Sequence, residues 1–235
     1  MGQIRATLLM LAAAILATGG AASGVAAAST GDGTPRGLAP EAVVEKVVTD
    51  ALQTIAEQHE RIQADRDSAR AIFDERILPF VDTQVMARFV MGPAARQAQP
   101  GEIERLESAL ARRIGNLYAG ALQRYTREAV DFASEGEVAL RTVTQDDRRA
   151  VIAANVRGPH VDDMTLRIQL YHRDDRWRVF DIETSGVSIL LVFRDALQSA
   201  GRNGDVDAMI AALEDGAVDV DSAWQSGSDP ADTTD

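Results

Sequence analysis

The hydrophobic positions of this chain change their spacing about halfway along it. In the first half, apolar residues recur every three or four positions, at Val44, Val48, Leu52, Ile55 and Ile62, and again from Ile103 to Tyr125. This spacing places the apolar side chains on one face of a helix. It predicts a long helix from Pro40 and a second long one after Pro100. Shorter helices are predicted over Ser68–Phe80 and Thr83–Met91.

In the second half the apolar residues alternate with polar ones. Met164, Leu166, Ile168 and Leu170 alternate with Thr165, Arg167, Gln169 and Tyr171. A period of two predicts strands, which we place at Val138–Thr144, Ala150–Arg157, Thr165–His172 and Arg176–Ile182. The short turns between them favour a four-stranded antiparallel meander. The predicted fold is α+β and similar to nuclear-transport-factor-like folds, with the sheet packed against a largely helical N-terminal half and C-terminal helices.

The last strand leads through Thr184, Ser185 and Gly186 into a helix predicted over Val187–Leu197, followed by a short one over Val206–Leu213. The first of these two helices is apolar on all sides, although a surface helix normally has a polar face. Either the protein core covers both sides, or one side contacts a hydrophobic ligand. Residues three and four positions apart share a face. We therefore expect two groups, one of Ile189, Val192 and Phe193 and one of Leu190, Leu191 and Leu197.

The N-terminal residues have the pattern of a secretory signal peptide. One basic residue, Arg5, precedes a mostly apolar run, and small residues follow it. The run is too short to span a bilayer. We expect a signal peptide over 1–28, a linker over 29–39, a single domain over 40–216 and a disordered acidic tail over 217–235. The chain has no cysteine, which excludes a lipoprotein anchor and disulfides. A soluble periplasmic protein is expected.

Charge and motifs argue against several classes of function. The net charge of −12 disfavours binding to nucleic acid and lasting adhesion to anionic membranes. The three histidines are scattered, so no metal site is predicted. Three pairs of aspartates fall at predicted turns, where Asp is common, namely Asp146-Asp147, Asp162-Asp163 and Asp174-Asp175. Ser188 follows a strand but lacks the surrounding glycine pair and a later histidine, so it is interpreted as a helix-start residue. No enzymatic activity and no cofactor are expected.

Two segments of the chain form recognisable motifs. The first is Ile77-Leu78-Pro79-Phe80-Val81-Asp82, continuing to Met86-Ala87-Arg88-Phe89-Val90-Met91-Gly92. The second is Trp177-Arg178-Val179-Phe180-Asp181-Ile182, with Gly186-Val187-Ser188-Ile189-Leu190 and Phe193-Arg194 after it. In sequence and in order, the two segments resemble the MlaC / toluene-tolerance family of periplasmic phospholipid-binding proteins.

The resemblance implies a monomeric carrier that holds a glycerophospholipid as cargo, with its acyl chains between sheet and helices. It would move lipid between an outer-membrane lipoprotein–porin complex and an inner-membrane ABC transporter complex. The implied lipid-contacting residues are the apolar positions of these elements: Met86, Phe89, Val90, Leu117, Leu166, Ile168, Leu170, Phe180, Ile189, Leu190 and Phe193.

The sequence departs from the family pattern at Thr83, Ala95 and Val192, and two of these positions have lost an aromatic residue. A cavity would be wider or differently shaped as a result, so a hopanoid-associated branch of the family is an alternative. Two other classes stay open from the residues themselves. One is a periplasmic enzyme with a nuclear-transport-factor-like cavity, and the other is a protein-interaction module that exposes an apolar surface.

Overall fold

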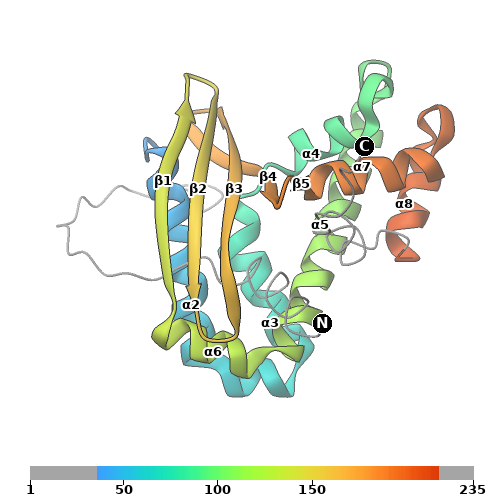
Figure 1. The fold of residues 1–235 in the computed structure, drawn as a ribbon. Helices are drawn as coiled ribbons and strands as arrows, with labels where there is room; N and C mark the ends of the chain where they lie inside the picture. Colours follow the sequence, from blue (N-terminus) through green and yellow to red (C-terminus); the bar gives the residue numbers. More distant parts are fainter. Residues whose placement is uncertain (1–35, 217–235) are drawn as a thin grey trace, which may run out of the picture. The chain divides into compact units, whose positions relative to one another are not determined.

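The computed structural model describes residues 36–216 of the chain (Figure 1). The predicted signal peptide and acidic tail lie outside these residues. The described residues form two units. The first contains 36–82 and 114–179, and the second contains 83–113 and 180–216. The single domain expected over 40–216 stays a prediction, and each unit is described by itself.

The first unit begins with α2 (Pro40–Ala64), the long amphipathic helix that the sequence predicts. Its apolar stripe is buried, at Val44, Val48, Leu52, Ile55 and Ile62. The helix is irregular at Gln58, where φ is −119° and ψ is 15°. His59 follows this irregularity and is exposed. Its Nδ1 atom lies 3.0 Å from the Ala56 carbonyl oxygen.

The helix predicted over Ser68–Phe80 is three shorter pieces. They are α3 (Arg66–Ile72), a π-helix (Phe73–Ile77) and a 3-10 turn (Leu78–Phe80). Asp65 caps α3, because its carboxylate accepts hydrogen bonds from the backbone N–H groups of Asp67 and Ser68. Pro79 has no N–H group to donate, which prevents a regular helix from continuing past it.

The helix after Pro100 is α5 (Pro100–Arg124), as predicted, and α6 (Thr126–Glu135) follows it. Sequence periodicity did not predict α6. The backbone of Tyr125 leaves the helical conformation and separates the two helices. The first unit contains α5 from Ile114 onward, and in it α6 packs against α2.

The sheet has five strands in the order β1-β2-β3-β4-β5, which corrects the prediction of four. The strands are β1 (Glu137–Gln145), β2 (Arg149–Gly158), β3 (Val161–Arg173), β4 (Arg176–Thr184) and β5 (Val187–Ser188). The pairs β1–β2, β2–β3 and β4–β5 are antiparallel, which confirms the predicted α+β class with an antiparallel sheet. Periodicity missed β5 because two residues are too few to show it. The similarity to nuclear-transport-factor folds stays a prediction.

One face of β2 and β3 is apolar and buried. Ile152 lies opposite Ile168, and two alanines, Ala150 and Ala154, lie opposite Leu170 and Leu166. Helix α2 packs against β1 and β2, and Figure 1 shows it behind these strands. Its first turn is tied to β1, because Glu41 accepts hydrogen bonds from the backbone N–H and the hydroxyl of Thr142.

Two of the three aspartate pairs lie in turns, as predicted. Asp146 accepts hydrogen bonds from the N–H groups of Arg148 and Arg149 between β1 and β2. The pair Asp174-Asp175 has positive φ at both residues between β3 and β4. The prediction for Asp162-Asp163 is wrong, because this pair lies inside β3. There Asp163 accepts a hydrogen bond from the Arg157 guanidinium at 3.0 Å.

The second unit contains α4 (Thr83–Met91), a 3-10 turn (Gly92–Arg96), α5 up to Arg113, the end of β4, β5, α7 (Ile189–Ala200) and α8 (Val206–Glu214). Helix α4 has the predicted bounds. Helix α7 packs against both α4 and α8. Exposed ion pairs join α5 to α8, through Arg105 with Asp207 and Arg112 with Glu214. Such pairs contribute little stability each.

Candidate lipid-binding site

The start of α7 is positioned by the hairpin of β4 and β5. Glu183 pairs with Ser188, and Thr184 pairs with Val187. Between them, Ser185 and Gly186 both have positive φ, 50° and 79°. Two such residues in a row are typical of the tight turns that match the twist of antiparallel strands. The helix therefore begins at Ile189, two residues later than predicted.

A buried carboxylate, that of Asp181, holds the first turn of α7. One oxygen accepts a hydrogen bond from the Ser188 hydroxyl at 2.7 Å, and the other accepts one from the Leu190 N–H at 3.0 Å. The Ser188 oxygen in turn accepts a bond from the Leu191 N–H at 3.0 Å. These bonds satisfy N–H groups that a helix leaves free at its start. They confirm Ser188 as the helix cap and reveal Asp181 as its partner.

The environment of Asp181 raises its pKa above the usual value. Burial is the largest cause, because it disfavours the charged carboxylate. The hydrogen bonds from Ser188 and Leu190 lower the pKa, but they do not outweigh burial. The carboxylate is engaged in holding the helix, which accounts for its position without a catalytic role.

Helix α7 buries one face and leaves other apolar side chains only partly covered. Leu190, Phe193 and Leu197 are buried. Ile189 and Val192 are half-buried, and Leu191 is 38% exposed. The predicted grouping is therefore wrong, because Phe193 lies three and four positions from Leu190 and Leu197 and is buried with them. The partly covered residues Ile189, Leu191 and Val192 are named here the outer residues of α7.

Helix α4 contributes three of the predicted lipid-contacting residues. Met86 and Val90 are buried, whereas Phe89 is 38% exposed. The Arg194 guanidinium of α7 lies over the Phe89 ring, 5.4 Å from its centre. In the same pair of helices, the Gln198 side-chain amide donates a hydrogen bond to the Val90 carbonyl oxygen at 3.0 Å. The exposed ring of Phe89 is therefore held beside α7 within the second unit.

The remaining predicted residues lie in β3, α5 and β4. Leu166, Ile168 and Leu170 are buried side by side on the apolar face of β3, as their alternation predicted. Leu117 in α5 and Phe180 in β4 are half-buried. The structure thus brings together the three β3 residues in the first unit, and Met86, Phe89 and Val90 with α7 in the second. That all eleven line one acyl-chain site stays a prediction.

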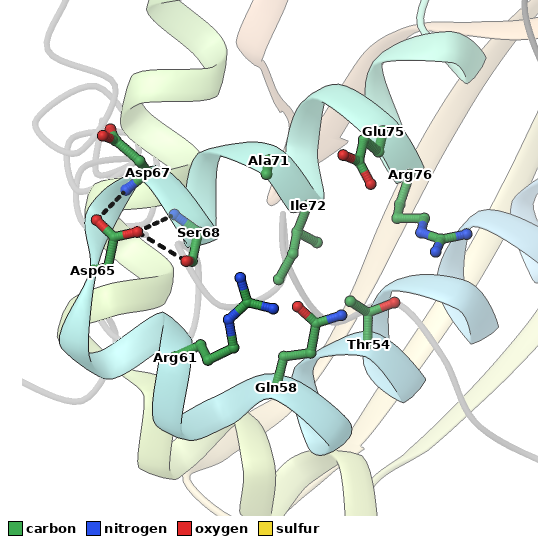
Figure 2. Close-up of a pocket in the computed structure, with 10 residues that line it drawn as sticks. All are labelled: Thr54, Gln58, Arg61, Asp65, Asp67, Ser68, Ala71, Ile72, Glu75 and Arg76. Atoms are coloured by element: carbon green, nitrogen blue, oxygen red, sulfur yellow. Dashed lines mark hydrogen bonds between the residues drawn. The ribbon is translucent and has the colours of Figure 1, made fainter.

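A polar pocket of about 350 Å³ lies in the first unit, between the last turns of α2 and the α3–π-helix segment. Figure 2 shows Gln58 and Arg61 on the α2 side and Ile72, Glu75 and Arg76 on the other. None of the eleven predicted residues lines it. Sequence reasoning missed this pocket because its charged residues look like ordinary solvated positions, and no spacing rule brings the two helices together.

Among residues 36–216, no group of three or more His, Asp or Glu side chains could hold a metal ion. No helix within the same described range is long and apolar enough to cross a membrane.

The elements above define an α+β protein with a largely helical N-terminal half and an antiparallel meander that leads into an apolar helix. The chain belongs to the MlaC protein family, whose model matches residues 45–215. This match covers most of the described chain and confirms the resemblance seen in the two sequence segments.

Two curated relatives carry names from the same family. The toluene tolerance protein ttg2D of Pseudomonas putida is 24% identical over 174 residues, which cover 73% of this chain and 78% of the relative. The intermembrane phospholipid transport system binding protein MlaC of Haemophilus influenzae is 22% identical over 151 residues, 64% of this chain and 69% of that protein.

A solved structure shares the fold. It is a phospholipid-binding protein from Ralstonia solanacearum in complex with a phospholipid, with a TM-score of 0.64 and 21% sequence identity. The alignment covers 76% of this chain and 96% of that one. Almost the whole of that protein therefore has a counterpart in this chain.

Proposed function

We propose that this protein is a phospholipid carrier without enzymatic activity. The observation that carries the proposal is the anchored helix α7. Its first turn is fixed by Asp181 and Ser188, yet its outer residues Ile189, Leu191 and Val192 are large and apolar and are not fully buried. A fixed helix with uncovered apolar side chains suits an apolar ligand, and the names of the Haemophilus influenzae relative and of the solved structure support phospholipid as the class of ligand.

The energetics explain why lipid transfer needs such a protein. The two acyl chains of a phospholipid hold about 30 methylene groups, and each costs about 0.8 kcal/mol to expose to water. The total is on the order of 20 kcal/mol, which prevents unassisted transfer. The carrier must shelter the chains nearly as well as a membrane does, but not better, or the lipid would not be released.

The proposal extends to the place and partners of transport. The signal-peptide pattern of residues 1–28 supports export to the periplasm. There the protein would act as a monomer that collects lipid from one membrane system and delivers it to the other. Its partners would be an outer-membrane lipoprotein–porin complex and an inner-membrane ABC transporter complex. A glycerophospholipid is the proposed cargo, bound without a cofactor.

The test is to identify what the exported protein carries. The chain is expressed with its N-terminal segment, released by osmotic shock, purified without detergent, and extracted with organic solvent. Mass spectrometry should find stoichiometric phospholipid in the extract, and the intact mass should place the new N-terminus between residues 24 and 31. A hopanoid in the extract would assign the cargo to the alternative branch of the family.

An empty extract is checked by a second experiment. The purified protein is incubated with phospholipid vesicles, separated from them by size, and extracted again. A protein that stays empty after this step is not a phospholipid carrier, and the interaction-module hypothesis would replace the proposal. Retention of the N-terminal segment in the membrane fraction would contradict the proposed export.

A further inference from the structure

The polar pocket of the first unit is lined by irregular backbone on both sides. On one side α2 departs from helical geometry at Gln58. On the other side the chain forms a π-helix over Phe73–Ile77, which contributes Glu75 and Arg76 to the lining. π-helices are rare and are found frequently at functional sites. Because the irregular backbone of α2 and the π-helix line the same pocket, we interpret the pocket as a structural feature of the fold and not as an incidental space between helices.

The charged groups in this pocket are free to bind. The side chains of Gln58, Arg61, Glu75 and Arg76 make no hydrogen bond or ion pair with any other residue of the range 36–216. Figure 2 shows the Arg61 guanidinium and the Gln58 amide directed from α2 towards the opposite helix. In the same view the Glu75 carboxylate is directed towards α2.

The other acidic residues of the lining do not neutralise these arginines by direct pairing. Both carboxylate oxygens of Asp65 accept hydrogen bonds from the start of α3, and these bonds lower its pKa, with a smaller contribution from the charge of Arg61. The carboxylate of Asp67 is directed away from the pocket in Figure 2. The Thr54 hydroxyl donates its hydrogen to the Asp50 carbonyl oxygen at 2.7 Å, so towards a ligand Thr54 offers only an acceptor.

These groups match a ligand that carries both signs of charge. Guanidinium groups bind phosphate oxygens through paired N–H donors, and a free carboxylate attracts an ammonium group. We propose that the pocket binds a small zwitterion, with its phosphate against Arg61 and its ammonium against Glu75. This chemistry is shared by the phosphoethanolamine headgroup of a phospholipid and by its water-soluble glycerol phosphodiester. The volume of about 350 Å³ is at the lower end of the range for small-molecule sites.

Calorimetric titration of the processed full-length protein tests this site without any lipid. The probes are glycerophosphoethanolamine, glycerol 3-phosphate and ethanolamine. We expect the zwitterion to bind most tightly. Arg61→Gln should weaken both phosphate probes about tenfold, as expected for the loss of a charge-assisted contact. Glu75→Gln should weaken the zwitterion by a similar factor and leave glycerol 3-phosphate unchanged or tighter.

A matched control separates the pocket from general charge effects. Arg127 is an exposed arginine of α6, outside the pocket lining. Arg127→Gln should leave the affinities for all three probes unchanged. The proposal is overturned if glycerophosphoethanolamine does not bind, if Arg127→Gln weakens it as much as the pocket variants do, or if Glu75→Gln affects both phosphate probes equally.

A last measurement distinguishes the two sources of the ligand. The lipid that copurifies with wild type and with Arg61→Gln is compared by mass spectrometry. A fall in the share of phosphatidylethanolamine in the variant assigns the pocket to the headgroup of the cargo. An unchanged share, together with the loss of glycerophosphoethanolamine binding, assigns it to a free zwitterion. Both results support the site. This comparison rests on the proposed carrier function, whereas the titration with glycerophosphoethanolamine does not.

Discussion

At the scale of single residues, Asp181 connects the sheet to the apolar helix. Its two carboxylate oxygens receive hydrogen bonds from Ser188 and from the first turn of α7. The same burial that protects these bonds from water disfavours the negative charge. Asp181 therefore favours the folded state more when it is protonated than when it is ionised.

The sign of the resulting pH dependence follows from linkage. The pKa of Asp181 is raised in the folded protein, so the folded state binds the proton more readily than the unfolded state does. The contribution of this group to stability is fully present below the unfolded pKa and is lost as the pH rises through the folded pKa. Urea unfolding of wild type and Asp181→Asn at a series of pH values should show the wild type gaining relative stability from pH 7 towards pH 4. A constant difference between the two proteins would contradict this account.

A second residue-scale prediction concerns Gly115 in α5. A Cβ atom at this position would lie 2.6 Å from the Arg70 Nε atom and 2.8 Å from the Phe73 Cδ1 atom. Arg70 has little freedom to move, because it donates hydrogen bonds to Asp74 and Asn116. We expect Gly115→Ala to lower the free energy of unfolding by about 1–3 kcal/mol, as overpacking does.

The matched control for Gly115 is Gly101, at the other end of the same helix. Nothing lies within 4 Å of a Cβ atom built there. Gly101→Ala should therefore keep or raise stability, by up to about 1 kcal/mol, because alanine restricts the unfolded chain more than glycine does. Denaturant unfolding of both variants measures the difference. Equal effects of the two substitutions would show that close packing at Gly115 does not matter.

At the scale of the elements, substitutions in α7 can distinguish residues that are needed for folding from residues that are needed for lipid binding. Leu190 and Phe193 are buried, whereas Ile189, Leu191 and Val192 are not fully covered. We expect Leu190→Asp and Phe193→Asp to unfold the protein, because a buried unpaired charge costs several kcal/mol. Leu191→Asp should keep a melting temperature within a few degrees of wild type and lose bound phospholipid, since its charge can reach water when lipid is absent.

The measurement is an aspartate scan from Val187 to Phe193, in which Tm and extracted phospholipid are scored separately. Ser199→Asp serves as the control, because Ser199 is exposed at the far end of α7. If all variants of the scan lose fold and lipid together, α7 is ordinary core and the lipid must be bound elsewhere. Variants that keep both properties at Ile189, Leu191 and Val192 would also contradict the proposed role of the outer residues.

The elements also show what periodicity can predict. It located α2, α4, α5 and the four strands β1 to β4 to within a few residues, because each has a long apolar stripe or a clear alternation. Periodicity did not predict α6. The only apolar residues buried on this helix are Ala129 and Phe132, which are too few to form a clear stripe. Periodicity also predicted a regular helix where the structure has a π-helix, at Phe73–Ile77. A single extra residue in one helical turn leaves no clear pattern in the sequence.

Only part of the candidate site could be predicted from the sequence. The alternation in β3 correctly identified Leu166, Ile168 and Leu170 as residues of one buried face. The division of α7 was wrong because Phe193 is within three or four positions of Ile189, Leu190 and Leu197, so spacing alone does not decide with which of them it is buried. The partnership of Asp181 with Ser188 joins positions seven apart across a tight turn, which neither helical nor strand periodicity reports.

At the scale of the whole molecule, the net charge of −12 bears on how the protein would meet a membrane. A carrier must approach a bilayer, exchange a lipid and leave, and anionic lipid repels an acidic protein. Between exposed charges this repulsion extends about 10 Å at 0.1 M salt and about 30 Å at 0.01 M salt. The rate of contact with a vesicle should therefore depend on both lipid charge and ionic strength.

The last prediction follows from this repulsion. With a fluorescent phospholipid in donor vesicles, uptake by the lipid-free protein at about 0.01 M salt should slow as the anionic share of the donor rises. Raising the salt to about 0.15 M should remove most of the difference, because the Debye length falls to about 8 Å. Zwitterionic donors are the control and should show little change with salt. If anionic donors were instead faster at low salt, a local basic surface would have to direct the encounter, and the acidic net charge would not describe how this protein approaches its membranes.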